Sequence, residues 1–168
     1  MITIPLFWVV ILDIAAWFFF HMSISLSLMK VSDKWYDQRS KGFTPWKWEK
    51  NGEIWQTVFR IRSWKKFLPD GTIIVKTAYD KTNLHEVDPV NLHKFIIETK
   101  RAELTHWALI PPAFLFFLWN PPWAGWCMVL YALIANMPFI IAQRYNRPRL
   151  ERLYQLMLKR KKRNKNYV

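Results

Sequence analysis

Two ionisable side chains at the start of an apolar stretch are the best candidates for chemistry in this sequence. Glu103 and His106 are three residues apart, so they would share one face of a helix. A carboxylate beside an imidazole orients the ring and supports its protonated form, as a general base requires when it takes a proton from a hydroxyl. The spacing therefore predicts an acid–base pair in which His106 is the base and Glu103 orients it.

A second group of polar residues is expected at the same level as this pair. Asn136 and Gln143 are two helical turns apart and share a face, and Arg144 follows directly. If the two apolar stretches that carry these residues are antiparallel, Gln143 and Arg144 return to the level of the acid–base pair. His21 lies about two turns from the end of a further apolar stretch. The helical spacing thus predicts one polar cluster near a membrane boundary.

The elements that would position this cluster follow from the distribution of charge. Lys and Arg number 25 against 12 Asp and Glu in 168 residues, a formal net charge of +13. No basic residue occurs in 1–29 or 102–143, whereas fifteen lie in 30–101 and ten in 144–168. Such segregation is typical of a membrane protein whose loops carry the charge.

We therefore predict a mostly α-helical, integral membrane fold in a single domain, 1–168. The predicted parts are three transmembrane helices and two basic regions: spans at about 5–29, 101–119 and 123–143, a partly interfacial cytoplasmic segment at 30–100, and a cytoplasmic tail at 144–168. A stretch of about 20 apolar residues matches the hydrocarbon thickness. The positive-inside rule predicts a multi-pass protein of the cell membrane, with the N-terminus outside and both basic regions inside.

Local signals add detail. Asp88-Pro89 is a typical helix start, and Pro111-Pro112 should kink or end the second span. Glu53–Lys66 has the spacing of one amphipathic helix, placed either in the membrane interface or against the rest of the domain. Residues 72–77 could form a short strand, and Arg144–Arg149 should be followed by a separate short helix near 150–158.

Other chemistry is less well supported by these residues. A Glu-x-x-His pair also occurs in carboxylate-bridged metal centres, but those need more carboxylates and histidines than the spans contain, so no metal site is expected. Glu103 could instead only neutralise Arg144 or Arg101. Because the positive charge adjoins apolar spans, anionic lipid or a phosphate-bearing ligand is expected as partner rather than nucleic acid.

Two unusual strings resemble the glycosyl-4,4′-diaponeurosporenoate acyltransferase family of staphyloxanthin-type carotenoid synthesis. One is IETKRAELTHW at 97–107, and the other contains QRYNRPRL at 143–150. The resemblance covers roughly residues 33–155 and does not extend to the first span. It implies a small membrane enzyme that esterifies a sugar hydroxyl of a glycosylated carotenoid with a long-chain fatty acyl group.

The resemblance and the helical spacing select many of the same positions. The expected catalytic residues are His106 and Glu103. The expected substrate-binding residues are Lys100, Arg101, Asn136, Gln143, Arg144, Tyr145, Asn146 and Arg147. No bound cofactor is expected, and acyl-CoA or an acyl-carrier protein would supply the acyl group. The alternatives are an acyltransferase that acts on another membrane glycolipid, and a non-catalytic lipid-binding or scaffold protein.

Overall fold

The computed structural model describes residues 5–68 and 88–165, which contain helices and loops but no strand. The predicted mostly helical fold is thus confirmed for these residues, while the short strand predicted at 72–77 lies outside them. The elements are, in order, α1 (Leu6–Met29), α2 (Asp33–Gln38), η1 (Ser40–Phe43), η2 (Lys47–Gly52), α3 (Glu53–Phe59), α4 (Ile61–Trp64), η3 (Lys65–Phe67), α6 (Pro89–Ala108), η4 (Pro111–Leu118) and α7 (Pro122–Lys165).

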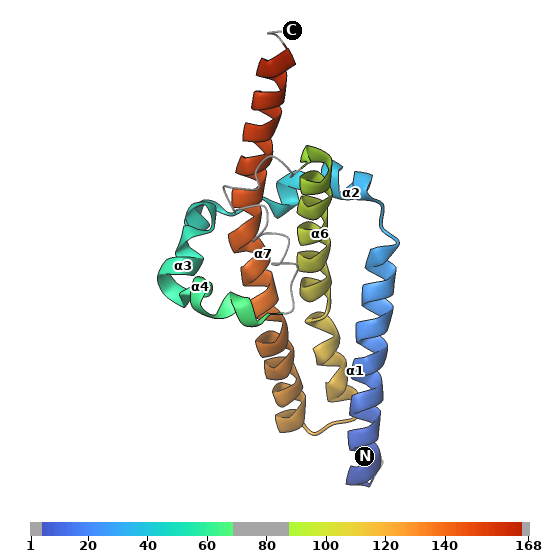
Figure 1. Cartoon of the computed structure of the whole chain (residues 1–168). Helices are drawn as coiled ribbons and strands as arrows, with labels where there is room; N and C mark the ends of the chain where they lie inside the picture. Colours follow the sequence, from blue (N-terminus) through green and yellow to red (C-terminus); the bar gives the residue numbers. More distant parts are fainter. Residues whose placement is uncertain (1–4, 69–87, 166–168) are drawn as a thin grey trace.

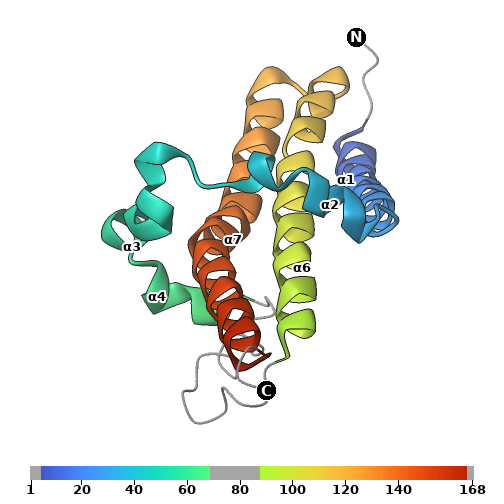
Figure 2. The ribbon, with the colours of Figure 1, turned by 90° about the horizontal axis from the view of Figure 1, so that it is seen from above.

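The long elements stand side by side in a row. Figure 1 shows α1, then α6 continued by η4, then α7, with α3 and α4 on the far side of α7. The view from above in Figure 2 gives the same order. The beginning of α1 and the turn between η4 and α7 lie at one end, and α2 crosses at the other.

Two of these helices, α1 and α7, are long and apolar enough to cross a membrane. Almost none of the apolar stretch of α1 is buried inside the chain, and Leu6, Phe18 and Phe19 are among its many exposed apolar residues. Exposed apolar side chains on this scale need an apolar partner outside the chain. Length and composition alone support a membrane span here.

The predicted second span is not one α-helix. Asp88 caps α6 by accepting a hydrogen bond from the Val90 backbone nitrogen at 3.3 Å, with Pro89 at the first helical position, which confirms the predicted helix start. The helix ends at Ala108, and a 3-10 helix follows from Pro111. Since neither proline has an N–H to donate, the α-helical hydrogen bonds stop there, as the Pro111-Pro112 pair predicted.

Helix α7 is longer than predicted, because it runs without a break through Arg144–Arg149 to the basic tail. The proline at 148 was expected to separate two helices, yet it lies inside one. Around it, Leu150 packs with Leu92 and Ile96 of α6 in a buried cluster. Apolar packing against α6 therefore compensates for the hydrogen bond that Pro148 cannot make.

The residues from Trp46 to Phe67, which we call the flanking segment, pack against the side of α7. Trp55 and Ile61 are buried with Ile141, Ala142 and Tyr145 of α7. The helix predicted over 53–66 is divided, because Arg60 has a φ of 48° and ends α3. Val58 and Phe59, the last two residues of α3, are exposed.

Gly52 allows the flanking segment to approach α7 closely. Its φ is +85°, a left-handed conformation that glycine adopts without steric cost. A Cβ atom at this position would lie 2.9 Å from the carbonyl oxygen of Arg144 and 3.2 Å from the Cα of Tyr145. Both atoms belong to the backbone of a helix and cannot move aside easily.

We expect Gly52→Ala to destabilise the protein by about 2 kcal/mol or more, because the left-handed backbone alone costs a residue with a Cβ about 1–2 kcal/mol. The measurement is thermal unfolding of the purified protein in detergent, followed by circular dichroism. Gly42→Ala is the matched control, since a Cβ at Gly42 would meet nothing within 4 Å. Equal midpoints for the two variants would contradict the close approach.

Candidate active site

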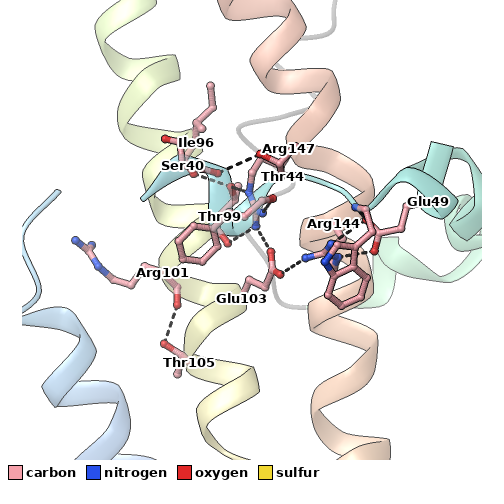
Figure 3. Close-up of polar contacts among 12 residues, drawn as sticks. Ser40, Thr44, Glu49, Ile96, Thr99, Arg101, Glu103, Thr105, Arg144 and Arg147 are labelled. Carbon is pink, nitrogen blue, oxygen red and sulfur yellow. Dashed lines mark hydrogen bonds and ion pairs between the residues drawn. The ribbon is translucent and has the colours of Figure 1, made fainter. Parts of the chain in front are cut away.

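Four buried charged side chains join three elements of the fold. They are Glu49 of η2, Glu103 of α6, and Arg144 and Arg147 of α7, and we call them the arginine–glutamate cluster. In Figure 3 Glu103 points from α6 between the two arginines, while Glu49 approaches Arg144 from the other side. Their exposed fractions lie between 0% and 4%.

Arg144 is held from two directions. Its Nε donates to Oε1 of Glu49 at 2.6 Å and its Nη2 donates to Oε2 at 2.9 Å, which is the bidentate geometry of a strong ion pair. Its Nη1 donates to Oε1 of Glu103 at 2.7 Å. The guanidinium carbon also lies 4.4 Å from the centre of the Trp46 ring. These contacts leave little of Arg144 available for a ligand.

Arg147 is equally well satisfied. Its Nη2 donates to the second oxygen of Glu103 and to the carbonyl oxygen of Thr99, the latter at 3.1 Å. Its Nε donates to Oγ1 of Thr99 at 3.1 Å, and its Nη1 donates to the carbonyl oxygen of Phe43 at 2.8 Å. Every guanidinium nitrogen of Arg147 therefore has an acceptor, as a buried cation requires.

The charges of the cluster balance, two negative against two positive. Removing such charges from water costs several kcal/mol per ion, and their mutual attraction offsets this only when geometry and hydrogen bonding are good. Here both conditions hold, so the main effect of the cluster is to position the helices that carry it, and its net contribution to stability is smaller. It fixes α6, α7 and η2 in one register.

His106 is held by Asn136 and not by Glu103. Its Nδ1 lies 2.8 Å from Oδ1 of Asn136, and its ring stacks on Phe139 with centres 4.5 Å apart and planes at 10°. Both carboxylate oxygens of Glu103 accept from arginines instead. The predicted Glu103–His106 contact is replaced because two guanidinium groups attract the carboxylate more strongly than a neutral ring does.

The second hydrogen bond of Asn136 fixes the proton on the imidazole. Nδ2 of Asn136 donates to the carbonyl oxygen of Ala132 at 2.8 Å, so Oδ1 must face His106. An amide oxygen only accepts, and therefore Nδ1 of His106 carries the hydrogen. In a neutral ring this leaves Nε2 unprotonated, which is the form that a general base needs.

The predicted polar cluster thus divides into two layers along the helices. Arg144 and Glu103 form one layer, while Asn136 and His106 form the other. Asn136 and Arg144 are eight residues apart on α7, or about 12 Å along the helix axis at 1.5 Å per residue. The structure brings α6 and α7 together at both levels, with separate partners at each.

Comparison with known proteins identifies the family. The sequence model of glycosyl-4,4′-diaponeurosporenoate acyltransferases matches residues 32–156. A protein of that name from Staphylococcus aureus (strain bovine RF122 / ET3-1) is 36% identical over 148 residues, which cover 88% of this chain and 89% of the relative. The relative of the same name from strain Newman is 39% identical over 145 residues, or 86% and 87% of the two chains.

The chain belongs to the glycosyl-4,4′-diaponeurosporenoate acyltransferase family. It is therefore an acyltransferase, as the resemblance in the sequence predicted. No solved structure matches it significantly.

The family match contains both polar layers of the acyltransferase but not α1, which ends at Met29. Asp13 of α1 accepts hydrogen bonds from Nε1 of Trp119 at 2.7 Å and from Nδ2 of Asn120 at 2.8 Å. Asp13 thus connects α1 to the turn between η4 and α7. The His21 ring lies near that of Trp17, with ring centres 5.9 Å apart and planes tilted by 48°.

Two predicted binding residues of α6 in the acyltransferase face the segment after α1. Arg101 donates to Oδ1 of Asp33 at 2.7 Å and also pairs with Glu98. Lys100 is buried and its Nζ donates to Oγ of Ser40 at 2.9 Å. Burial lowers the pKa of the Lys100 ammonium group. In this conformation both side chains connect α6 to residues 33–40.

Two further predicted residues lie on the other side of α7, against the flanking segment. The hydroxyl of Tyr145 accepts from Nε of Arg62 at 2.7 Å, and Oδ1 of Asn146 accepts from Nζ of Lys65 at 2.9 Å. Tyr145 and Asn146 therefore do not share a surface with His106. Gln143, the last predicted residue, is buried.

Glu49, Thr99 and Phe139 contribute to the two layers but are absent from the prediction. Glu49 is preceded by Trp46, whose backbone nitrogen donates to Oε2 of Glu49 at 3.1 Å. Glu49 is one half of a capping box, but position 46 holds Trp instead of Ser or Thr, and a capping box predicts a helix start and not a salt bridge. The partner of Glu49 lies 95 residues away, beyond the reach of local spacing.

Proposed function

We propose that this acyltransferase transfers a long-chain fatty acyl group to a sugar hydroxyl of a glycosylated carotenoid. The support is the name of its relatives, which identifies glycosyl-4,4′-diaponeurosporenoate as their substrate. Extensive exposed apolar surface on α1 suits a lipid acceptor of this kind. The acyl group would come from a thioester of CoA or of an acyl-carrier protein.

We further propose that the enzyme acts in a membrane, with three spans and both basic regions on the cytoplasmic side. The apolar lengths of α1 and α7 support this placement. So does the charge distribution, because no Lys or Arg interrupts residues 1–29 or 102–143. The two polar layers would then lie near the inner boundary, where a soluble thioester can meet a lipid acceptor.

The hydrogen bond between His106 and Asn136 carries the catalytic part of the proposal. With Nδ1 donating to Asn136, Nε2 of His106 takes the proton of the sugar hydroxyl as its oxygen attacks the thioester carbonyl carbon. The tetrahedral intermediate then expels the thiolate, which receives that proton from His106. The products are the ester and a free thiol, so the enzyme returns to its starting state.

Glu103 has a positioning role in this mechanism, since it holds Arg144 and Arg147 and thereby sets α6 against α7. Substrate binding by Lys100, Arg101, Gln143, Arg144, Tyr145, Asn146 and Arg147 stays a prediction. An anionic ligand would have to compete with Glu49 or Glu103 for Arg144. Basic residues outside the arginine–glutamate cluster are therefore better placed to hold donor phosphates.

The test is an acyl-transfer assay with the full chain in lipid nanodiscs. Glycosyl-diaponeurosporenoate and a radiolabelled acyl-CoA or acyl-carrier protein are supplied, and the products are identified by mass spectrometry. We expect an ester on the sugar and a stoichiometric thiol. An ester on another membrane glycolipid, with the carotenoid glycoside left unchanged, would show that this glycolipid is the acceptor instead. The absence of ester with either donor would refute the reaction.

Asn136 provides a further prediction about the mechanism. We expect Asn136→Leu to lower kcat by about 10–100-fold, by analogy with the loss seen when the hydrogen-bond partner that orients a metal-binding histidine is removed. Asn136→Asp keeps an acceptor toward Nδ1 and should retain more activity. Nitrogen-15 NMR of histidine-labelled protein measures which ring nitrogen is protonated, with His106→Ala assigning the signal. A protonated Nε2 in the unaltered enzyme would contradict this mechanism.

A further inference from the structure

The flanking segment contains a row of neighbouring aromatic rings, most of which are exposed. The rings of Trp46 and Trp48 are 5.7 Å apart, those of Trp48 and Trp55 5.3 Å, and those of Trp55 and Phe59 5.7 Å. Trp55 is buried against α7, whereas the other three are about half exposed. Phe67, at the end of the segment, is 77% exposed. Clustered exposed aromatic side chains of this kind are typical of a binding surface.

Positive charge accompanies these aromatic side chains. The flanking segment contains six basic residues and two acidic ones. Lys47, Lys50, Arg60 and Lys66 are exposed, whereas Glu49 is buried in the arginine–glutamate cluster. The accessible surface of the segment is therefore both aromatic and cationic, which complements an anionic surface that has an apolar layer beneath it.

The position of the flanking segment on α7 indicates which anionic surface it would contact. It packs on Met137, Ile141, Ala142 and Tyr145, at the point where the apolar run of α7 ends and Arg144 begins. If α7 crosses a membrane, this level is the boundary between hydrocarbon and water. Trp is enriched at that depth in membrane proteins, because its ring is apolar and its N–H is polar.

We propose that the flanking segment lies in the headgroup region of an anionic cytoplasmic leaflet, with Trp46, Trp48, Phe59 and Phe67 directed into the lipid. This inference rests on the membrane placement proposed above. The lipid would also stabilise the candidate site, because Trp46 covers the guanidinium of Arg144 and its backbone holds Glu49. Contact with the bilayer and the geometry of the cluster are thus linked through one residue.

The depth of spin labels tests this proposal without reference to catalysis. Single cysteines replace Trp48, Phe59 or Thr57 in a Cys127→Ser background, and the labelled protein is placed in bilayers of phosphatidylcholine with phosphatidylglycerol. Power saturation then compares collisions with oxygen, which prefers lipid, and with a water-soluble nickel chelate. We expect labels at Trp48 and Phe59 to favour oxygen. The label at Thr57, on nearly the opposite side of α3 from Phe59, should favour nickel.

A label at exposed Ile134 on α7 separates the two proposals. If the label at 134 is accessible to oxygen while the labels at 59 and 48 are accessible to nickel, the inference is overturned and the membrane placement stays intact. Nickel-accessible Ile134 would overturn the placement itself. Protection of Phe59 and Trp48 from both reagents would indicate a protein partner and would also overturn the inference. Charge reversal in Lys47→Glu/Lys50→Glu should reduce oxygen access at Phe59 in the mixed bilayer but not in phosphatidylcholine alone.

Discussion

His106→Ala is expected to lower kcat for ester formation by about 10²–10⁴-fold, the usual contribution of a positioned general base. The loss should appear in kcat more than in KM, because the imidazole removes the proton in the transition state and is not required to hold the acceptor. The variant should remain folded, since His106 is only half-buried and the arginine–glutamate cluster does not include it. The assay is steady-state acyl transfer in nanodiscs at varied acceptor concentration.

His93→Ala is the matched control for this experiment. His93 is on the same helix, but it contacts Oδ1 of Asp37 at 3.1 Å and stacks near Tyr154. Its removal should leave kcat close to that of the unaltered enzyme. Comparable turnover by His106→Ala and His93→Ala would exclude His106 as the base. If only His106→Ala loses activity, equal thermal midpoints of the two variants would show that the loss is not caused by unfolding.

Glu103→Gln is expected to lower the free energy of unfolding by about 3–5 kcal/mol, because it leaves one guanidinium in excess in a buried, formerly balanced cluster. Arg144 and Arg147 each lose a charged acceptor, while the volume of the side chain is conserved. Denaturant titration of the purified protein, followed by tryptophan fluorescence, measures the change. Breaking the cluster should also loosen α6 against α7 and so reduce activity indirectly.

A double variant tests whether charge balance is the cause. Glu103→Gln/Arg147→Gln leaves Glu49 and Arg144 as a balanced pair, so it should be less destabilised than the two single changes would predict by addition. Glu98→Gln is the matched control on α6, because the Glu98 side chain is 55% exposed and its ion pair with Arg101 should contribute under about 1 kcal/mol. Equal effects of Glu98→Gln and Glu103→Gln would contradict the proposed role of the cluster.

The structure also shows why helical spacing assigned the wrong neighbour to His106. Glu103 and His106 do share one side of α6, as their spacing of three residues requires. Side-chain partners, however, are selected by electrostatics across the helix interface. A carboxylate facing two guanidinium groups binds them, and the imidazole then pairs with the neutral amide of Asn136.

Local rules predicted element boundaries well where a residue changes its own backbone hydrogen bonding. Asp88-Pro89 begins α6 and Pro111 ends the α-helical part, because a cap and a missing N–H act on their immediate neighbours. Local rules predicted element boundaries less well where tertiary packing outweighs the helix propensity of a residue. Pro148 stays inside α7 because Leu150 is buried against α6, and Arg60 divides an amphipathic segment that the periodicity joined.

The sequence by itself determined the helical class, the apolar stretches, the basic regions and the family, since composition and characteristic strings of residues are properties of the linear chain. It also identified His106 and Asn136, because polar residues in an apolar stretch are conspicuous. Only the tertiary structure decided which of these side chains touch. Glu49 binds Arg144, which lies 95 residues further along the chain, and Gly52 permits the close approach. Folding closes this long loop, and no local sequence pattern at either end indicates which residue will be the partner.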